Sequence, residues 1–84
     1  MTPLHYAVDR GNQDIVLLLL DNSADVNSQD ACGETPLMLA VICEHEELIS
    51  LLRCHGADIT IANNDGLTVL DMDGLSEEIM TILK

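Results

Sequence analysis

The sequence predicts an all-α repeat solenoid, in which helix pairs joined by short β-hairpin-like arms stack into about two and a half repeats. Two observations support this fold class. Related segments begin at Thr2, Thr35 and Thr68, and their constant spacing of 33 residues is typical of a stacked-repeat array. Hydrophobic residues make up 48% of the chain, yet it has one Tyr and no Phe or Trp. The core must therefore be aliphatic, which suits closely packed helices better than a sandwich of sheets.

The first helix of each pair is clearest in the middle copy. Asp30–Gly33 is typical of a turn, and it contains a glycine that can adopt a conformation straining other residues. Thr35 is placed to cap a helix, and Pro36 takes the first helical position, where its missing N–H costs nothing. An apolar face follows, and the polar pair Glu44 and His45 interrupts it.

The second helix of the middle copy begins at Glu46. Leucine and isoleucine occupy positions i, i+1, i+3 and i+4 from Leu48, so one helix face is apolar, and Gly56 marks its C-terminal stop. Ile59 and Ile61 then alternate with polar residues before a turn, a pattern that indicates an extended arm rather than a helix.

Extending this pattern to all three copies divides the chain. We expect one domain, 1–84, with repeats at approximately 1–30, 31–63 and 64–84. Helix pairs are expected near residues 3–20, 36–53 and 69–83, and extended arms near 24–30 and 57–63.

The repeats are expected to stack, because two helices and an arm cannot bury their apolar faces alone. Small Ala7 and Ala40 at equivalent positions would let helices approach closely. Leu4, Leu37 and Leu70 recur and would form one continuous core row.

These residues resemble the ankyrin repeat, whose pattern is roughly GxTPLHxA, a turn with Gly, an IVxLLL helix and GADVN. The first copy matches with TPLHYA, RGN, IVLLLL and ADVN, and the second with GETPLMLA, LISLL and HGADI. Several separate motifs keep one spacing, and the resemblance covers essentially the whole chain. It implies that His5, on the His of TPLH, belongs to a hydrogen-bond network at the helix start.

The outer copies depart from this pattern. The chain starts at MTPLH without the first hairpin, which leads us to expect a fragment of a larger protein. In the third copy Val69 replaces the Pro, and Ile79, Ile82 and Leu83 fit the helix pattern only if two residues are deleted between the helices. Thr68 and Asp71 resemble a capping box, with Asp in place of Glu. The third copy therefore looks like a terminal capping repeat.

No constellation of residues predicts catalysis, a cofactor or a metal site. Zinc-ligand types do occur, at His5, His45, His55, Cys43 and Cys54. However, the CEH segment lies between helices, while the CH segment lies about 13 Å away along the second helix by helical rise. Core and turn roles are expected for these residues. The carboxylates fit solvated surface charge, and no nucleophile with a plausible base, GxSxG motif or phosphate-binding loop occurs, so we expect no enzyme.

Charge limits the kinds of partner that are expected, and cysteine content indicates the compartment. Fifteen acidic residues against three basic ones give a formal net charge of −12. No basic patch is present to neutralise phosphates, so neither nucleic acid nor anionic membrane is an expected partner. The longest apolar run, Ile15–Leu20, is too short to span a bilayer, and no signal peptide is evident. Cys32, Cys43 and Cys54 are odd in number and lack a disulfide-framework spacing, which favours a reducing, cytoplasmic location.

The resemblance also implies a binding surface. In ankyrin arrays partners usually meet the concave face, which is made by the hairpin tips and the outer side of the first helix of each repeat. Carried over by motif position, this face comprises Asp9, Arg10, Gln29, Ala31, Cys32, Glu34, Ile42, Cys43, Ala62, Asn64, Asp65 and Leu67. Apolar character at Ile42 and Cys43 either serves contact with a partner or merely completes the helix end, and the sequence leaves both readings open.

We expect a non-enzymatic protein–protein interaction module whose acidic concave face engages a protein, possibly a basic one. A narrower resemblance gives an alternative: LHYAVDRGNQDIV, ADVNSQD, one full repeat and a degenerate last one look like the ankyrin tail of long acyl-CoA-binding proteins. The chain would then be a partner-binding appendage of a lipid carrier, with the acyl-CoA site in a separate domain.

A missing first hairpin would also leave a helix face uncovered, so marginal stability or self-association through the first repeat is expected.

Overall fold

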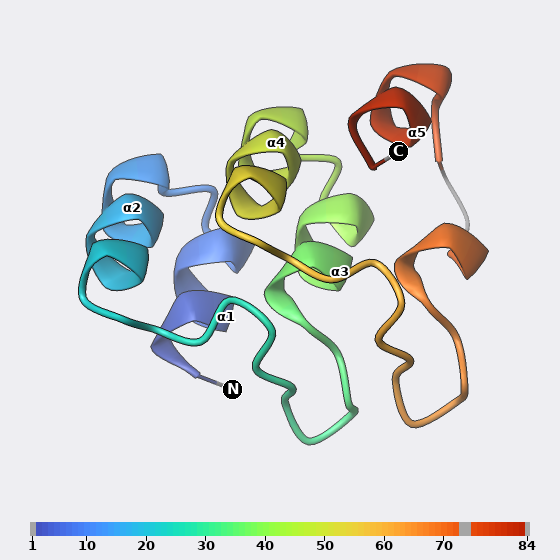
Figure 1. Ribbon diagram of the computed structural model, residues 1–84, viewed down its shortest axis with the longest axis horizontal. Helices are drawn as coiled ribbons and strands as arrows, with labels where there is room; N and C mark the ends of the chain where they lie inside the picture. Colours follow the sequence, from blue (N-terminus) through green and yellow to red (C-terminus); the bar gives the residue numbers. More distant parts are fainter. Residues whose placement is uncertain (1, 73–74, 84) are drawn as a thin grey trace.

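A computed structural model describes residues 2–72 and 75–83. Its elements are α1 (Pro3–Asp9), α2 (Gln13–Asp21), α3 (Pro36–Ile42), α4 (Glu46–Cys54), η1 (Val69–Asp71) and α5 (Glu77–Leu83). In Figure 1, α2, α4 and α5 form one row and α1, α3 and η1 a second, with the connecting arms beyond the second row. The all-α prediction is confirmed. We call the pairs α1–α2, α3–α4 and η1–α5 repeats 1, 2 and 3.

Threonine caps start the first helices of repeats 1 and 2, as the sequence predicts. Thr2 Oγ1 accepts a hydrogen bond from the backbone N–H of His5, and Thr35 Oγ1 accepts one from that of Met38, each at 3.3 Å. A proline follows each cap in the first helical turn. These seven-residue helices are therefore fixed at their starts, because each cap satisfies a backbone donor that the helix leaves free.

Aliphatic side chains form the core, and α1 packs directly against α3. Leu4 and Leu37 are 2% and 1% exposed, and Ala7 and Ala40 are also buried. Burying one leucine contributes roughly 1.5–3 kcal/mol relative to leaving it exposed, so these contacts are the main source of stability. Leu70, the predicted third member of the leucine row, is only half-buried.

A buried histidine ties repeat 1 to the segment before repeat 2. His5 is fully buried; its Nδ1 lies 2.6 Å from the Thr2 hydroxyl oxygen, and its Nε2 lies 2.7 Å from the Glu34 carbonyl oxygen. Because a carbonyl oxygen only accepts, Nε2 carries the proton and Nδ1 accepts from the hydroxyl. The hydrogen-bond network expected at the helix start is confirmed, and it also links two repeats.

Repeat 3 differs from the helix pair predicted over 69–83. Its first helix is reduced to the single 3-10 turn η1, and Met72 is already extended. Residues 73 and 74 of the predicted span lie outside the described residues. Helix α5 begins at Glu77, two residues earlier than a 33-residue step from Glu46 would place it, which confirms the predicted deletion.

The capping box of repeat 3 is also confirmed. The N–H and the hydroxyl of Thr68 both donate to Asp71 Oδ2 at 3.0 Å. The two bonds hold the start of η1, although this helix has only three residues.

The arms, arm 1 (residues 22–34) and arm 2 (residues 55–67), are hairpin-like turns, and none of the described residues forms a β-strand. Side chains link them: Asn27 Oδ1 accepts from the N–H of Asp58 at 2.8 Å. Hydrogen bonds from the hydroxyl and the N–H of Thr60 hold the pKa of the Asp58 carboxyl below its ordinary value.

The α-helices have seven or nine residues, and within the described part of the chain none has the length and apolar character that crossing a membrane requires.

Candidate functional site

The tips of the two arms share one backbone geometry. In arm 1, Asp30 Oδ1 accepts hydrogen bonds from the backbone N–H groups two and four residues later, at 2.9 and 3.0 Å. In arm 2, Asn63 Oδ1 does the same at 2.9 and 3.1 Å. Gly33 and Gly66 close these turns with φ of +78°, a value that favours glycine. Local bonds therefore hold both tips in defined positions.

Two residues predicted for the concave face brace one arm against the other. Gln29 Nε2 donates to the Ala62 carbonyl at 3.0 Å, and Asn64 Nδ2 donates to the Ala31 carbonyl at 2.8 Å. The backbone N–H of Asn64 also donates to the Cys32 carbonyl at 3.0 Å. Gln29 and Asn64 thus position the tips, where Ala31, Cys32 and Ala62 are exposed.

Four other predicted residues come together at a hollow of about 440 Å³ beside α3, η1 and the arm tips. They are Glu34 of arm 1, Ile42 of α3, and Asp65 and Leu67 of arm 2. Ile42 and Leu67, two large apolar side chains, are 54% and 42% exposed. The site therefore combines exposed apolar groups with carboxylates, and we call it the acidic hollow.

Three further residues line the acidic hollow and were not predicted as site residues: Asn63, Asp71 and Met72. The sequence analysis assigns Asp71 only to the capping box. Hydrogen bonds from the backbone N–H of Thr68 and, with a smaller effect, from its hydroxyl hold the pKa of the Asp71 carboxyl below its ordinary value. Asp71 therefore adds a negative charge to the hollow. A signal existed in the sequence: the position that is apolar Met38 in the second copy is acidic in the third.

The remaining predicted residues lie at the ends of α1 and α3, outside the lining of the hollow. Asp9 and Arg10 are exposed where α1 ends. Cys43 is half-buried. Burial raises the pKa of its thiol, and the negative charge of Asp9 adds a smaller effect in the same direction. Ile42 and Cys43 therefore differ in setting, because only Ile42 lines the acidic hollow.

Metal-ligating residue types do not gather in the part of the chain that the structure describes. No group of three or more His, Cys, Asp or Glu side chains there is arranged to hold a metal ion. Both ring nitrogens of His5 are used in the fold, and Cys32, Cys43 and Cys54 are free thiols.

Comparison with known proteins identifies the repeat. A family model described as ankyrin repeats, three copies, matches residues 1–63. The chain is 37% identical to an ankyrin repeat-containing protein of Schizosaccharomyces pombe, over 98% of this chain and 40% of that protein. It is 44% identical to the E3 ubiquitin-protein ligase XBAT33 of Arabidopsis thaliana, over 74% of this chain and 12% of that protein.

A third relative is Rabankyrin-5 of Mus musculus, which is 40% identical over 80% of this chain and 6% of its own length. The chain thus spans less than half the length of each of these relatives. Stacked helix pairs, matching arm tips and the sequence matches agree, and the chain belongs to the ankyrin repeat family.

Proposed function

We propose that this ankyrin array binds a protein whose contact segment places basic residues beside an apolar side chain, and that the segment enters the acidic hollow. Ankyrin repeats are protein–protein interaction modules, and this chain is such a module. The observation that carries the proposal is the exposure of Ile42 and Leu67 next to three carboxylates, those of Glu34, Asp65 and Asp71.

Net charge and the exposed apolar side chains support a partner of this chemistry. The chain has a net charge of −12, so its field attracts a basic partner and speeds the encounter. A few residues near the centre of a contact, packed and shielded from water, supply most of the binding energy. The other predicted residues of the concave face, at the arm tips and at the ends of α1 and α3, would extend the contact around this centre.

Three further expectations belong to the proposal. The ankyrin repeat family is non-catalytic, and we propose that this chain is non-catalytic too. The word ligase in the name of the Arabidopsis thaliana relative describes that protein. The net charge argues against nucleic acid as a partner. Three free thiols fit a reducing compartment, and we place the function in the cytoplasm. Self-association would use the uncovered helix face of repeat 1 rather than the acidic hollow, and it stays a prediction.

The lipid-carrier alternative has no support from the relatives named above. Calorimetry of this chain with acyl-CoA tests ligand binding at the array itself, and we expect no heat. A saturable heat at micromolar acyl-CoA would contradict the assignment of this array as a protein-binding module only.

Binding is tested with short synthetic peptides in which Lys and Arg flank a central Leu. Two control peptides replace the central Leu by Gly, or the basic flanks by Glu. The double change Glu34→Lys and Asp65→Lys should weaken binding about five- to tenfold, mainly by slowing association, and less so at high salt. Ile42→Asp should weaken binding at every salt concentration, because it removes an apolar contact.

Leu18→Asp is the matched control for Ile42→Asp, because Leu18 is 61% exposed on α2 and does not line the hollow. It should leave the affinity unchanged, and all variants should keep the circular dichroism of the parent chain. Equal loss in the Ile42 and Leu18 variants would contradict the proposal. So would unchanged affinity in the Glu34/Asp65 and Ile42 variants.

A further inference from the structure

The second helices of repeats 1 and 2 frame a groove that the proposed function does not use. Helices α2 and α4 lie in the row farther from the arms (Figure 1). Helix α4 packs closely against α5 but only lightly against α2, and a hollow of about 420 Å³ lies between α2 and α4. We call it the outer groove, and it is lined by Gln13, Leu17, Glu47, Ser50, Leu51 and Cys54.

The middle of the outer groove is apolar without being part of the core. Leu17 is 38% exposed, and it occupies the variable position of the IVxLLL pattern. Leu51, from the other wall, is half-buried. At the position equivalent to Leu17, repeat 2 has Ser50, which is also exposed. The fold therefore accepts a polar side chain at this position, and the apolar surface of Leu17 is free for contact with a partner.

One end of the outer groove is acidic. A second hollow, of about 360 Å³, adjoins it, because Gln13 and Glu47 line both. The amide of Gln13 donates a hydrogen bond to the Glu47 carboxylate and so joins the two helices at this point. Three exposed carboxylates line the second hollow, namely those of Glu44, Glu46 and Glu47. The groove thus leads from an acidic end, where α4 begins, to an apolar middle.

Glu44 stands at a position whose backbone favours glycine. Its φ is +58°, and the equivalent residue of repeat 1, Gly11, has a φ of +68°. A side chain at such a φ strains the backbone, so the fold gains nothing from a glutamate here. His45 also lines this hollow, and its ring lies against Gly11. The charge of Glu44 is instead explained by contact with a basic group.

We propose that the outer groove binds an amphipathic helix of a partner protein. Apolar residues of that helix lie on Leu17 and Leu51, and two or more basic residues in its last turn lie beside the acidic end. Cations are favoured near the C-terminus of a helix, where they complement its dipole. Since the acidic end is where α2 and α4 begin, the bound helix runs antiparallel to both of them.

The walls of the groove select a helix over an extended segment. Backbone N–H and C=O groups along α2 and α4 are bonded within these helices, so an extended peptide would find no main-chain partners there. A helix satisfies its own backbone groups. The nine residues of α4 span about 13 Å by helical rise, which matches about two and a half turns of the partner. Apolar residues at i, i+4 and i+7 would therefore face the groove.

Two other occupants fit the charges less well. The chain has only three basic residues, Arg10, Arg53 and Lys84, so a second copy offers no helix with two of them in its last turn. Copies with a charge of −12 each also repel one another. An anionic membrane surface would be repelled by the carboxylates at the acidic end.

The test uses a labelled synthetic helix of about 15 residues, with Leu at i, i+4 and i+7 and Lys in the last turn. Fluorescence anisotropy measures its affinity. Leu17→Ser should weaken binding about fivefold at every salt concentration. Glu44→Gly should weaken it about as much at low salt and less at high salt. Each variant takes the residue of the equivalent position in the other repeat, so its circular dichroism should match the parent chain.

Two controls separate this groove from other surfaces. Leu18→Ser should leave the affinity unchanged, because Leu18 is 61% exposed on the same helix and does not line the groove. Ile42→Asp should also leave it unchanged, because Ile42 lines the acidic hollow. Binding of the helical peptide is therefore independent of the function proposed for that hollow.

The orientation has its own measurement. Cys32→Ser and Cys43→Ser together leave Cys54 as the single thiol, in the groove at the end of α4. A cysteine in the first turn of the peptide should form a disulfide with Cys54 several-fold faster than one in the last turn. The last turn should lie at the opposite, acidic end of the groove.

Four results would overturn the inference. The first is the lack of saturable binding by the helical peptide, and the second is unchanged affinity in both the Leu17 and Glu44 variants. The third is an equal loss in the Leu18 or Ile42 variant, which would assign the peptide to another surface. The fourth is faster disulfide formation from the last turn of the peptide, which would contradict the antiparallel arrangement.

Discussion

Gly33 occupies a position where both the backbone and the neighbouring arm exclude a side chain. Its φ is +78°, and a Cβ built there would lie 2.6 Å from Asn64 Oδ1 and 2.7 Å from the Asn64 backbone nitrogen. Gly66 has the same φ, but no atom lies within 4 Å of its Cβ position. Gly66→Ala should cost about 1–2 kcal/mol of unfolding free energy, from backbone strain alone. Gly33→Ala should cost clearly more, as measured by urea unfolding; equal losses would show that the contact between the arms contributes nothing.

His5 is the residue-scale link between two repeats. In the second copy Met38 stands at the equivalent position and is equally buried, so His5→Met keeps an acceptable side-chain volume. It removes the hydrogen bonds to the Thr2 hydroxyl and the Glu34 carbonyl. We expect a loss of about 1–3 kcal/mol in unfolding free energy, because buried polar groups lose their partner. A variant as stable as the parent would mean that these bonds are energetically neutral.

At the scale of elements, the sequence predicts α1 to α4 well and the start of repeat 3 poorly. The first two copies keep the capping threonine, the proline and an apolar run, and these local signals agree with the stack that buries the run. Where the second copy continues as MLAV, the third continues as DMDG. Such a segment offers no continuous apolar face to bury, so the helix is not extended beyond η1. The hydroxyl and N–H bonds of Thr68 were predictable because a capping box depends only on neighbours in the sequence.

The same element gives a prediction about acid. Hydrogen bonds from Thr68 lower the pKa of Asp71 in the folded chain, so protons bind it more readily when the chain is unfolded. Its contribution to stability is therefore present above the unfolded pKa, near 3.9, and is lost as pH falls through the lower folded value. Asp71→Asn should be less stable than the parent at neutral pH, and the difference should shrink in strong acid. Urea unfolding at several pH values measures this, and a constant difference would contradict it.

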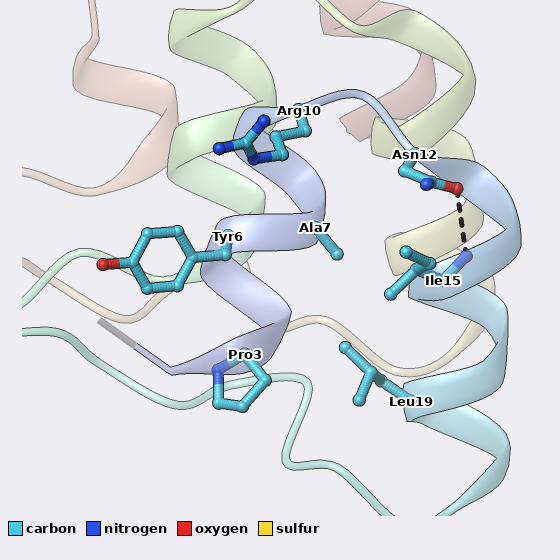
Figure 2. A pocket seen from close by; sticks show the side chains of 7 residues that line it. All are labelled: Pro3, Tyr6, Ala7, Arg10, Asn12, Ile15 and Leu19. Carbon is cyan, nitrogen blue, oxygen red and sulfur yellow. Dashed lines mark hydrogen bonds between the residues drawn. The ribbon is translucent and has the colours of Figure 1, made fainter.

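At the scale of the whole molecule, the sequence leads to the prediction of a concave binding face but not to the acidic hollow. Its lining comes from both arms, α3, η1 and the residue after it, and only the stack brings these segments together. Gln29 and Asn64 show the same limit, because a motif position does not reveal that their amides brace the arms. The sequence analysis foresaw an uncovered helix face in repeat 1, but not the residues that line a hollow there, among them Pro3, Tyr6 and Ile15 (Figure 2).

Net charge acts on the whole molecule as well. The described chain measures 29 × 26 × 20 Å, and the Debye length falls from about 30 Å at 0.01 M salt to about 8 Å at 0.15 M. Sodium chloride over this range should raise the melting temperature, because it screens repulsion among the excess carboxylates. The double change Glu44→Gln and Asp65→Asn neutralises two exposed carboxylates outside the helices, so it should raise the melting temperature at low salt and reduce the salt effect. A melting temperature that falls with added salt would contradict this view.

Repeat 2 has neighbours on both sides within the described structure, and its residues Pro36–Val41 are all buried, whereas repeat 3 begins with one short turn. Amide hydrogen exchange should therefore be slowest in α3 and faster in η1, because local opening is easiest where few buried contacts resist it. The acidic hollow joins these two regions, so a bound peptide would slow exchange in Val69–Asp71 far more than in α3. Part of the binding energy would be spent on holding the end of the array in place, and affinity would then rise in any variant that orders repeat 3 beforehand. Exchange in η1 that is already as slow as in α3 without peptide would exclude this coupling.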